Sequence, residues 1–364
     1  MDEPLNRSRL HERHADAGAA FCQHGRWTFP ACFSSVDEEY RALQEDAGLI
    51  DLPASGLIEL TGPDRVRFLH GMVSNDIKSL PPGAGCYAAM LTPQGRLLAD
   101  MRIYCLPDSL LISADWGLCQ KLPPLLKKYI IADRVTLNDT SDTFAVISVQ
   151  GPKAAKLLEK AAAFSALPTL PFSHGAHSIR DVSVRICSVR RTTSGGFDLI
   201  LQGDKLDEVW NHLVDSGREL GVRPAGLSAL QIQRVEAGIP WYGIDMDETS
   251  LAVEAGLQEA LSFDKGCYIG QEIVARATHR GHVNWKLKGL LLSGGTVASQ
   301  GDKLFWEDKE AGWVTSSVFS PRLNRSVAMG YVRREHEEMG TRLELRHQDD
   351  RIDAEVVQLP LVSC

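Results

Sequence analysis

The chain lacks the sequence features of several large protein classes. Its 364 residues carry 39 Lys and Arg against 47 Asp and Glu, a net charge of −8, whereas general nucleic-acid binding needs a basic surface. No apolar run approaches the roughly 18 residues of a membrane span. The first residues also lack the basic and apolar segments of a secretion signal. We therefore expect a cytoplasmic protein that contacts neither nucleic acid nor membrane.

Paired cysteines and nucleotide-binding motifs are also missing. The eight cysteines are scattered and no two of them form Cys-x-x-Cys, which is typical of reduced, intracellular proteins. This spacing argues against a resident zinc ion or iron–sulfur cluster, which usually needs closely paired thiolates. No phosphate loop, Gly-x-Gly-x-x-Gly or Gly-x-Ser-x-Gly motif is present. We expect no metal site in the chain itself.

The composition, with 44% hydrophobic and 24% charged residues, is that of an ordinary folded protein. A chain of this length suits more than one domain. Predicted strands and helices do not alternate regularly, which favours an α+β body with antiparallel sheets. After Trp285 the sequence changes to short apolar runs between Gly, Ser and Pro turns, which predicts a small β-barrel. We expect a body over residues 1–284 and a barrel over 285–364.

Local patterns predict where the main elements lie. In 87–106 two strands flank a Pro-Gln-Gly turn, with Leu97, Ala99, Met101 and Ile103 on one face and Asp100 on the other. The other predicted elements are a helix over 36–46, a strand over 56–60, a helix within 62–76, a strand over 109–115, a helix after the prolines of 120–131, a strand followed by a helix over 145–163, and a helix over 226–238.

The stretch DKGCYIGQE at 264–272 places a thiol beside a lysine and between glycines. An extended chain over 263–267 would point Lys265 and Cys267 to the same side, and helix-forming residues begin near Gln271. A nearby ammonium and a helix start both favour a thiolate, so we expect an accessible, acidified cysteine. The alternative is that Cys267 is a buried structural residue and Lys265 points to solvent.

The segment KGCYIGQE resembles the signature of the YgfZ family, folate-binding proteins related to the glycine-cleavage T-protein and implicated in iron–sulfur cluster assembly or repair. GPDRVRFLHGMVSNDI, LTPQGRLLAD and RVEAGIPWYGIDMDETSLAVEAGL are similar to further family blocks, so the likeness spans nearly the whole chain. It implies interleaved antiparallel sheets and helices around a central folate opening, followed by a C-terminal β-barrel. The signature positions are Lys265, Gly266, Cys267, Tyr268, Gly270, Gln271 and Glu272.

The resemblance also implies roles for other residues. T-proteins carry an Asp-Asp pair where this chain has Ala99-Asp100, so Asp100 is the remaining catalytic or folate-binding carboxylate, or else an exposed strand residue. Asp198 stands where T-proteins have a glutamate that holds the pterin ring. Arg234 is expected to pair with folate or to form a structural ion pair. Tyr242 is expected to stack on the pterin or to fill the core.

Three functions compete on this basis. The intact signature favours a tetrahydrofolate-binding protein that supports iron–sulfur cluster assembly or repair, with Cys267 and Lys265 as working residues and with assembly proteins or client enzymes as partners. The alternative is a folate-dependent aminomethyltransferase or other one-carbon transferase that uses Asp100. The third is a folate-binding regulatory protein without catalysis. Whether the chain is an enzyme stays open at this point.

Overall fold

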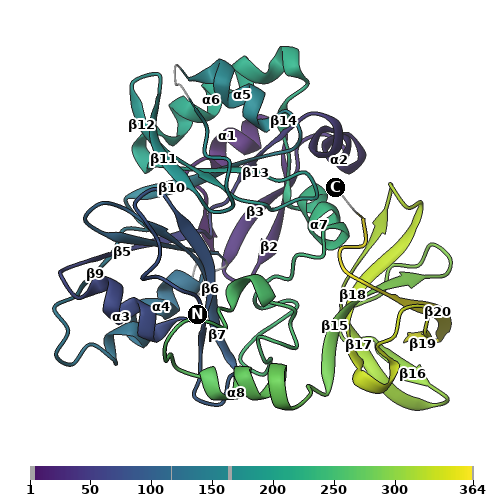
Figure 1. Cartoon of the computed structure of the whole chain (residues 1–364). Helices are drawn as coiled ribbons and strands as arrows, with labels where there is room; N and C mark the ends of the chain where they lie inside the picture. The colour runs from purple at the N-terminus through teal and green to yellow at the C-terminus, as the bar shows by residue number, and fades with distance from the viewer. Residues whose placement is uncertain (1–4, 116, 163–165, 363–364) are drawn as a thin grey trace. The chain divides into compact units, whose positions relative to one another are not determined.

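The computed structural model of the chain describes residues 5–115, 117–162 and 166–362. The chain forms two compact units, and each takes parts of the sequence that are far apart. The first comprises residues 1–88 and 100–230, and the second comprises 89–99 and 231–364. Figure 1 colours the chain by residue number. No described helix is long and apolar enough to cross a membrane.

The first six helices, two sheets and most of a third sheet belong to the first unit, and parts of β6 and β7 (residues 89–91 and 97–99) belong to the second. Figure 1 labels these elements. A three-stranded sheet has the order β1 (Asn6–Arg7), β3 (Trp27–Cys32), β2 (Ala20–His24). A six-stranded sheet has the order β11 (His174–Ile179), β12 (Val182–Ser188), β13 (Gly196–Gln202), β10 (Phe144–Gln150), β4 (Gly48–Asp51), β14 (Arg223–Pro224). A five-stranded sheet has the order β6 (Gly85–Leu91), β7 (Leu97–Cys105), β8 (Leu110–Ala114), β5 (Gly56–Thr61), β9 (Thr136–Asp139).

The helices predicted over 36–46, within 62–76 and within 145–163 are present in this unit. The helices are α1 (His11–Asp16), α2 (Val36–Glu45), α3 (Arg65–Met72), α4 (Leu118–Lys127), α5 (Ala154–Ala161) and α6 (Leu206–Gly217), with 3₁₀ turns η1 (Gly203–Lys205) and η2 (Arg218–Leu220). The side chains of α5 and α6 pack with the six-stranded sheet around Leu157, Val149 and Leu213, all fully buried. Antiparallel pairing predominates in both large sheets, which confirms the α+β prediction.

Buried and partly buried residues alternate along β7 as predicted, and this alternation decides which side chains of the strand reach the candidate site. Leu97, Ala99, Met101 and Ile103 are buried on one face, whereas Asp100 and Arg102 lie on the other and are only partly buried. Successive side chains of a strand point to opposite faces of the sheet. Ala99 therefore points into the core, and Asp100 points to the other face of the sheet.

The second unit is built on a closed β-barrel, which confirms the predicted barrel. Its strand order is β15 (Trp285–Leu292), β18 (Arg325–Arg333), β17 (Lys309–Ser320), β16 (Lys303–Trp306), β19 (Arg342–His347), β20 (Asp350–Val357), and β20 closes on β15. Its helical segments are α7 (Leu227–Glu236), whose last six residues lie in this unit, α8 (Gln271–Ala275), the π-helical turn η4 (Arg276–Arg280) and the 3₁₀ turns η3 (Gln258–Ala260) and η5 (Arg334–His336).

Helix α7 ends as its sequence predicts and packs on the barrel. Gly238 has a φ of +66°, and a Cβ at this position would meet the Leu359 side chain at 2.8 Å. Val235 is fully buried with Val327 and Met329 of the barrel. Gly238 therefore ends the helix where the backbone needs a positive φ and lies too close to Leu359 for any other side chain.

Two local predictions were wrong. Helix α4 begins at Leu118, before the prolines, and contains both Pro123 and Pro124. The buried residues Leu118, Leu122 and Leu126 recur every four positions, so the apolar stripe carries the helix through residues that lack a backbone donor. Residues 263–267 do not form a strand, because the chain bends at 263–265.

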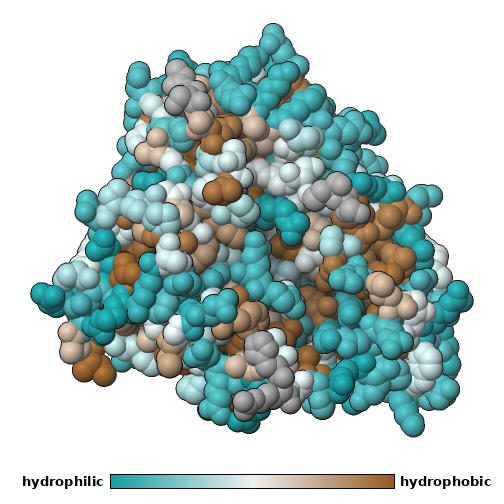
Figure 2. Space-filling view, in the orientation of Figure 1, coloured by the Kyte–Doolittle hydropathy of each residue, from teal (hydrophilic) through white to brown (hydrophobic). Residues whose placement is uncertain are grey.

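Polar and charged residues cover most of the face in Figure 2, with hydrophobic residues scattered among them. Ile131, Leu170 and Met339 are the most exposed large hydrophobic residues of the described chain, at 90%, 70% and 70%. Scattered apolar residues of this kind are normal on protein surfaces.

Candidate functional site

A buried cluster of two arginines and two aspartates lies in the first unit. Arg191 contacts two carboxylates at once: its Nη1 lies 2.8 Å from Asp115, and its Nη2 lies 2.7 Å from Asp198. Arg102 on β7 donates to the same carboxylate of Asp115 at 2.9 Å. The Arg191 and Asp198 side chains are 4% and 2% exposed. The cluster therefore joins the strand that carries Asp100 to the strand that carries Asp198.

Neutral side chains satisfy the remaining acceptors of the cluster. Ser55 donates to Asp115 at 2.7 Å, and Ser148 donates to Asp198 at 2.7 Å. Gln150 donates to Ser148 at 2.9 Å and accepts from the Arg191 backbone at 3.1 Å. A buried ion network is stabilising only when its charges are paired and hydrogen-bonded in this way.

Asp100 and Asp115 have opposite electrostatic environments. Burial raises the pKa of Asp100 above its ordinary value, against the opposing effects of the Tyr87 hydroxyl, which donates at 2.6 Å, and of Arg102. Burial also acts to raise the pKa of Asp115, but Arg191 and Arg102 outweigh it and hold that pKa well below its ordinary value. Asp100 is thus the carboxyl group suited to exchanging a proton, and Asp115 is suited to staying ionised.

Two buried hydroxyl groups near this cluster in the sequence have no oxygen or nitrogen hydrogen-bond partner among the described residues, and one of them faces the Cys187 sulfur. They belong to Tyr104 on β7 and to Thr192, which follows Arg191. Both side chains are fully or almost fully buried. Because buried hydroxyls are nearly always paired, these two are natural partners for a water molecule or for the polar atoms of a ligand. The residues present therefore fit a polar ligand.

Asp198 is not a free carboxylate. Arg191 binds it through Nε at 2.9 Å and through Nη2 at 2.7 Å, on top of the Ser148 hydrogen bond. Since an aspartate is also one methylene shorter than a glutamate, Asp198 presents its charge mainly to Arg191. A role for Asp198 toward folate stays a prediction.

Arg234 and Tyr242 lie in the second unit and are buried. Arg234 is 0% exposed, forms an ion pair with Asp245, donates to Ser316 at 2.6 Å and lies over the Trp241 ring at 4.6 Å. These contacts are those of the structural ion pair that the sequence left open as an alternative. Tyr242 is 9% exposed, and its folate contact stays a prediction.

The signature segment also lies in the second unit. Its lysine is buried, whereas its cysteine is exposed. Lys265 is 7% exposed, with its ammonium 4.8 Å from the centre of the Tyr268 ring, whereas Cys267 is exposed. The expectation that both side chains point to the same side depended on an extended chain, and the chain bends at 263–265 instead. The aromatic face of Tyr268 attracts the ammonium and lets Lys265 bury its stem.

The glycines of the signature differ in their surroundings. A Cβ at Gly266 would meet nothing within 4 Å, so the backbone beside Cys267 is open. Gly270 has a φ of +87°, and a Cβ there would meet the Thr92 carbonyl oxygen at 2.7 Å. Helix α8 then starts at Gln271, as predicted, and Glu272 pairs with Arg276 at its surface.

Sequence reasoning did not assign a role to four residues of the site, Tyr87, Arg102, Asp115 and Arg191. One signal was available: Tyr87 and Asp100 lie on paired halves of a predicted hairpin. Arg191 and Asp198 flank the glycines of a turn, seven positions apart. Asp115 lies 76 positions from Arg191, and no spacing rule connects residues at that distance.

Comparison with known proteins finds similarity along nearly the whole chain. Residues 10–265 match the family described as GCVT N-terminal domain, and residues 286–363 match the glycine cleavage T-protein C-terminal barrel domain. An aminomethyltransferase of Halothermothrix orenii is 31% identical, over 98% of this chain and 100% of its own. One from Thermotoga petrophila is 30% identical, over 98% of this chain and 97% of its own.

A solved structure agrees with these matches. The glycine cleavage system aminomethyltransferase T of Bartonella henselae superimposes with a TM-score of 0.90, at 25% identity and over 98% of both chains. The T-protein fold, with its mixed sheets and helices and its C-terminal barrel, is therefore the fold of this chain. By sequence and by structure, the chain belongs to the glycine cleavage T-protein family.

Proposed function

We propose that this protein binds a reduced folate and catalyses folate-dependent aminomethyl transfer, with Asp100 as the carboxyl group that handles the proton. The aminomethyltransferase family, to which its relatives belong, uses tetrahydrofolate. The observation that carries the proposal is the pairing of Asp100 with Tyr87 beside a second carboxylate, Asp115, that stays ionised. The sequence alone ranked iron–sulfur support first, and the relatives reverse that order.

The replacement of the first aspartate of the pair by Ala99 does not count against Asp100. Ala99 is fully buried in the core face of β7, whereas Asp100 lies on the opposite face with Arg102. A carboxylate at position 99 would lie among apolar side chains, where an unpaired charge is strongly disfavoured. Position 100 is the one from which a carboxyl group on this strand reaches the polar cluster.

Each residue of the cluster then has a defined task. A bound tetrahydrofolate would supply the nitrogen atoms that accept the one-carbon unit. The Asp100 carboxyl group binds and releases a proton at its Oδ atoms, and the Tyr87 hydroxyl, which donates to Oδ2, holds it in position. Arg102 is held by Asp115, and Arg191 holds Asp115 and Asp198. The hydroxyls of Tyr104 and Thr192, which lack an oxygen or nitrogen partner among the described residues, are candidate hydrogen-bond partners for the ligand.

The variant Asp100→Asn tests this proposal because it keeps the shape and removes the proton-exchanging group. We expect ammonia release from an aminomethylated lipoyl carrier to fall by about 10²- to 10⁴-fold. Titration calorimetry should show binding of tetrahydrofolate to the wild type, and to the variant with an affinity within a few-fold. Asp108→Asn is the matched control, because Asp108 is exposed and should leave both measurements unchanged.

Two results would contradict the proposal. One is the absence of heat on titration of the wild type with tetrahydrofolate. The other is turnover by Asp100→Asn at the rate of the wild type. A wild type that binds folate but releases no ammonia would shift the assignment to the second candidate.

The second candidate function is support of iron–sulfur cluster assembly or repair, in which Cys267 is the working thiol. One observation favours it: Cys267 is exposed, next to the open backbone of Gly266, within the signature segment. Aminomethyl transfer at Asp100 assigns no task to this thiol. Deletion of the gene in cells separates the two functions, since one predicts loss of iron–sulfur enzyme activities and the other loss of glycine breakdown.

Exposure predicts a distinct reactivity for Cys267. Burial raises the pKa of the Cys22, Cys105 and Cys187 thiols, and a thiol reacts through its thiolate. We expect iodoacetamide near neutral pH to label Cys267 at least about tenfold faster than buried Cys187, as read by peptide mass spectrometry. Labelling of Cys267 only after unfolding would contradict its assignment as a working thiol.

A serine variant tests its importance in cells. Cys267→Ser should leave the melting temperature nearly unchanged, because the side chain is exposed. If iron–sulfur support is the function, this variant should fail to restore iron–sulfur enzyme activities in a deletion strain, whereas the matched control Cys22→Ser should restore them. Full complementation by Cys267→Ser would remove this candidate.

A further inference from the structure

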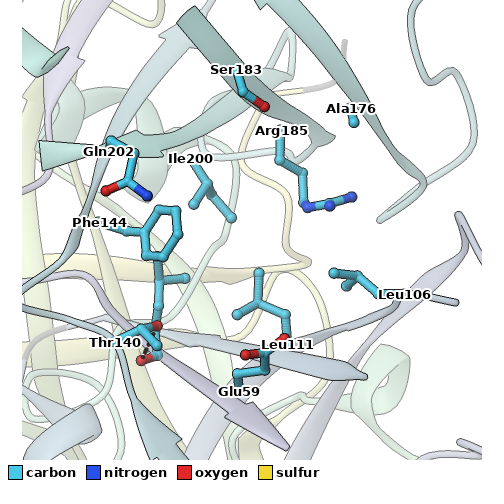
Figure 3. Close-up of a pocket in the computed structure, with 11 residues that line it drawn as sticks. Glu59, Leu106, Leu111, Thr140, Phe144, Ala176, Ser183, Arg185, Ile200 and Gln202 are labelled. Atoms are coloured by element: carbon cyan, nitrogen blue, oxygen red, sulfur yellow. Dashed lines mark hydrogen bonds between the residues drawn. The ribbon is translucent and has the colours of Figure 1, made fainter. Parts of the chain in front are cut away.

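A pocket of about 320 Å³ opens between the two large sheets of the first unit. Figure 3 shows that one wall comes from β11, β12 and β13, which carry Ala176, Arg185 and Gln202, and that the opposite wall carries Glu59 and Leu111. Its volume lies at the lower end of the roughly 300–1,000 Å³ typical of small-molecule sites. None of the residues to which the aminomethyl transfer is assigned lines it.

Arg185 is one of the residues that line this pocket (Figure 3). Its Nη1 donates to Nδ1 of His174 at 2.9 Å, and the described residues provide no carboxylate partner for it. Burial and the neighbouring Arg185 lower the pKa of His174 to about 4, so the imidazole is neutral and accepts this hydrogen bond. Its Nε2 is then the protonated nitrogen and donates to the Cys105 carbonyl oxygen at 3.0 Å. The arginine is therefore held from one side, with donors left for an anion.

Glu59 faces the same pocket from the other wall (Figure 3). It lies on β5, is partly buried, and makes no ion pair or side-chain hydrogen bond with the described residues. Arg185 and Glu59 do not pair with each other either, since no contact within 4.0 Å joins them among the described side chains. A half-buried cation and a half-buried anion thus face one cavity, and the described part of the chain gives neither of them a counter-charge. Such charges gain the most from a ligand that pairs with both.

The surface between the two charges is mainly apolar. Leu106, Leu111, Phe144 and Ile200 contribute to the lining, and Gln202 adds an amide. We propose that this pocket binds a small zwitterion with an apolar body, namely an α-amino acid with an apolar side chain. Its carboxylate pairs with Arg185, its ammonium pairs with Glu59, and its side chain packs on the leucines and Phe144. This inference is independent of the folate site, and the two can fail separately.

Titration calorimetry with L-leucine and two analogues tests the proposal. The analogue 4-methylpentanoate keeps the carboxylate and the chain of leucine but lacks the ammonium, and 3-methylbutylamine keeps the ammonium but lacks the carboxylate. Because each charged contact contributes separately, we expect each analogue to bind about tenfold or more weakly than leucine. Saturable binding of leucine that neither analogue matches is the expected result.

Two charge variants assign the contacts. Arg185→Gln should weaken leucine binding by about tenfold or more and should leave 3-methylbutylamine unaffected. Glu59→Gln should weaken leucine binding similarly and should leave 4-methylpentanoate unaffected or bound more tightly. The exposed residues Arg180 and Glu159 provide the matched controls Arg180→Gln and Glu159→Gln, which should bind leucine as the wild type does.

A third variant fills the pocket without changing charge. Ala176→Leu adds bulk to the wall beside Arg185 and should abolish leucine binding while thermal melting shows a folded protein. The proposal is overturned if leucine gives no saturable heat with the wild type, if 4-methylpentanoate binds as tightly as leucine, or if Arg185→Gln binds leucine unchanged. Tetrahydrofolate titrated into the same variants should behave as with the wild type, which keeps the two sites distinguishable.

Discussion

Replacement of Arg191 by methionine is expected to lower the free energy of unfolding by about 3–5 kcal/mol, since it leaves buried charges without their partner. Arg191 is 4% exposed and holds Asp115 and Asp198 at 2.8 and 2.7 Å. Methionine fills a similar volume, so the loss reflects the carboxylates and not a cavity: Asp198 loses its cation, and Asp115 keeps only Arg102. Urea denaturation of the wild type and of the variant at pH 7 measures the difference.

The neighbouring residue supplies the control. Arg190 is exposed, so Arg190→Met should change the free energy of unfolding by no more than about 0.5 kcal/mol. The double variant Arg191→Met with Asp198→Asn should recover part of the stability, because it removes the carboxylate that Arg191→Met leaves without a cation. Equal effects of Arg190→Met and Arg191→Met would rule out a central role for the cluster.

The same pair of proteins should respond differently to acid. Arg191 and Arg102 hold the pKa of Asp115 well below its ordinary value, so Asp115 stabilises the wild type above about pH 4. This contribution is lost as the pH falls toward the lowered pKa of the folded state. Without Arg191 that contribution is much reduced, and the stability difference between the two proteins should shrink below about pH 4.

Replacement of Arg234 by methionine is expected to destabilise the second unit by a similar amount, about 3–5 kcal/mol. Arg234 is fully buried and pairs with Asp245, which also accepts hydrogen bonds from Thr315 and Ser316 at 2.6 Å each. Removal of the guanidinium leaves the Asp245 carboxylate buried without its cation. Trp241, whose ring lies 4.6 Å from the guanidinium, provides a fluorescence signal close to the change.

An exposed ion pair of the barrel serves as the comparison. Arg351 pairs with Glu344 at 3.1 Å, with side-chain exposures of 67% and 32%. Such surface pairs contribute about 0–1 kcal/mol, so Arg351→Met should cost no more than that. If Arg234→Met were as mild as Arg351→Met, Arg234 would not be a structural ion pair, and its predicted folate contact would regain support.

The sequence by itself determined the local elements and the location of the barrel. The alternation of apolar and polar residues in β7 predicted that Asp100 and Ala99 point to different faces of the sheet, because side-chain direction in a strand repeats every two residues. Gly238 and Pro240 marked the end of α7, since that position requires a positive φ. The change to short apolar runs between turn residues at Trp285 coincides with the start of the first barrel strand. In each case the signal lies within a few neighbouring residues.

Only the tertiary structure decided which charges meet. Asp115 and Arg191 are 76 positions apart, and their contact depends on how two sheets pack, which no local pattern encodes. Lys265 and Cys267 were expected side by side, but the buried Tyr268 ring holds the lysine while the thiol stays exposed. Asp198 carries the residue type expected for a ligand contact, yet Arg191 occupies it. The sequence names the groups capable of chemistry, and packing and burial decide which partner each one has.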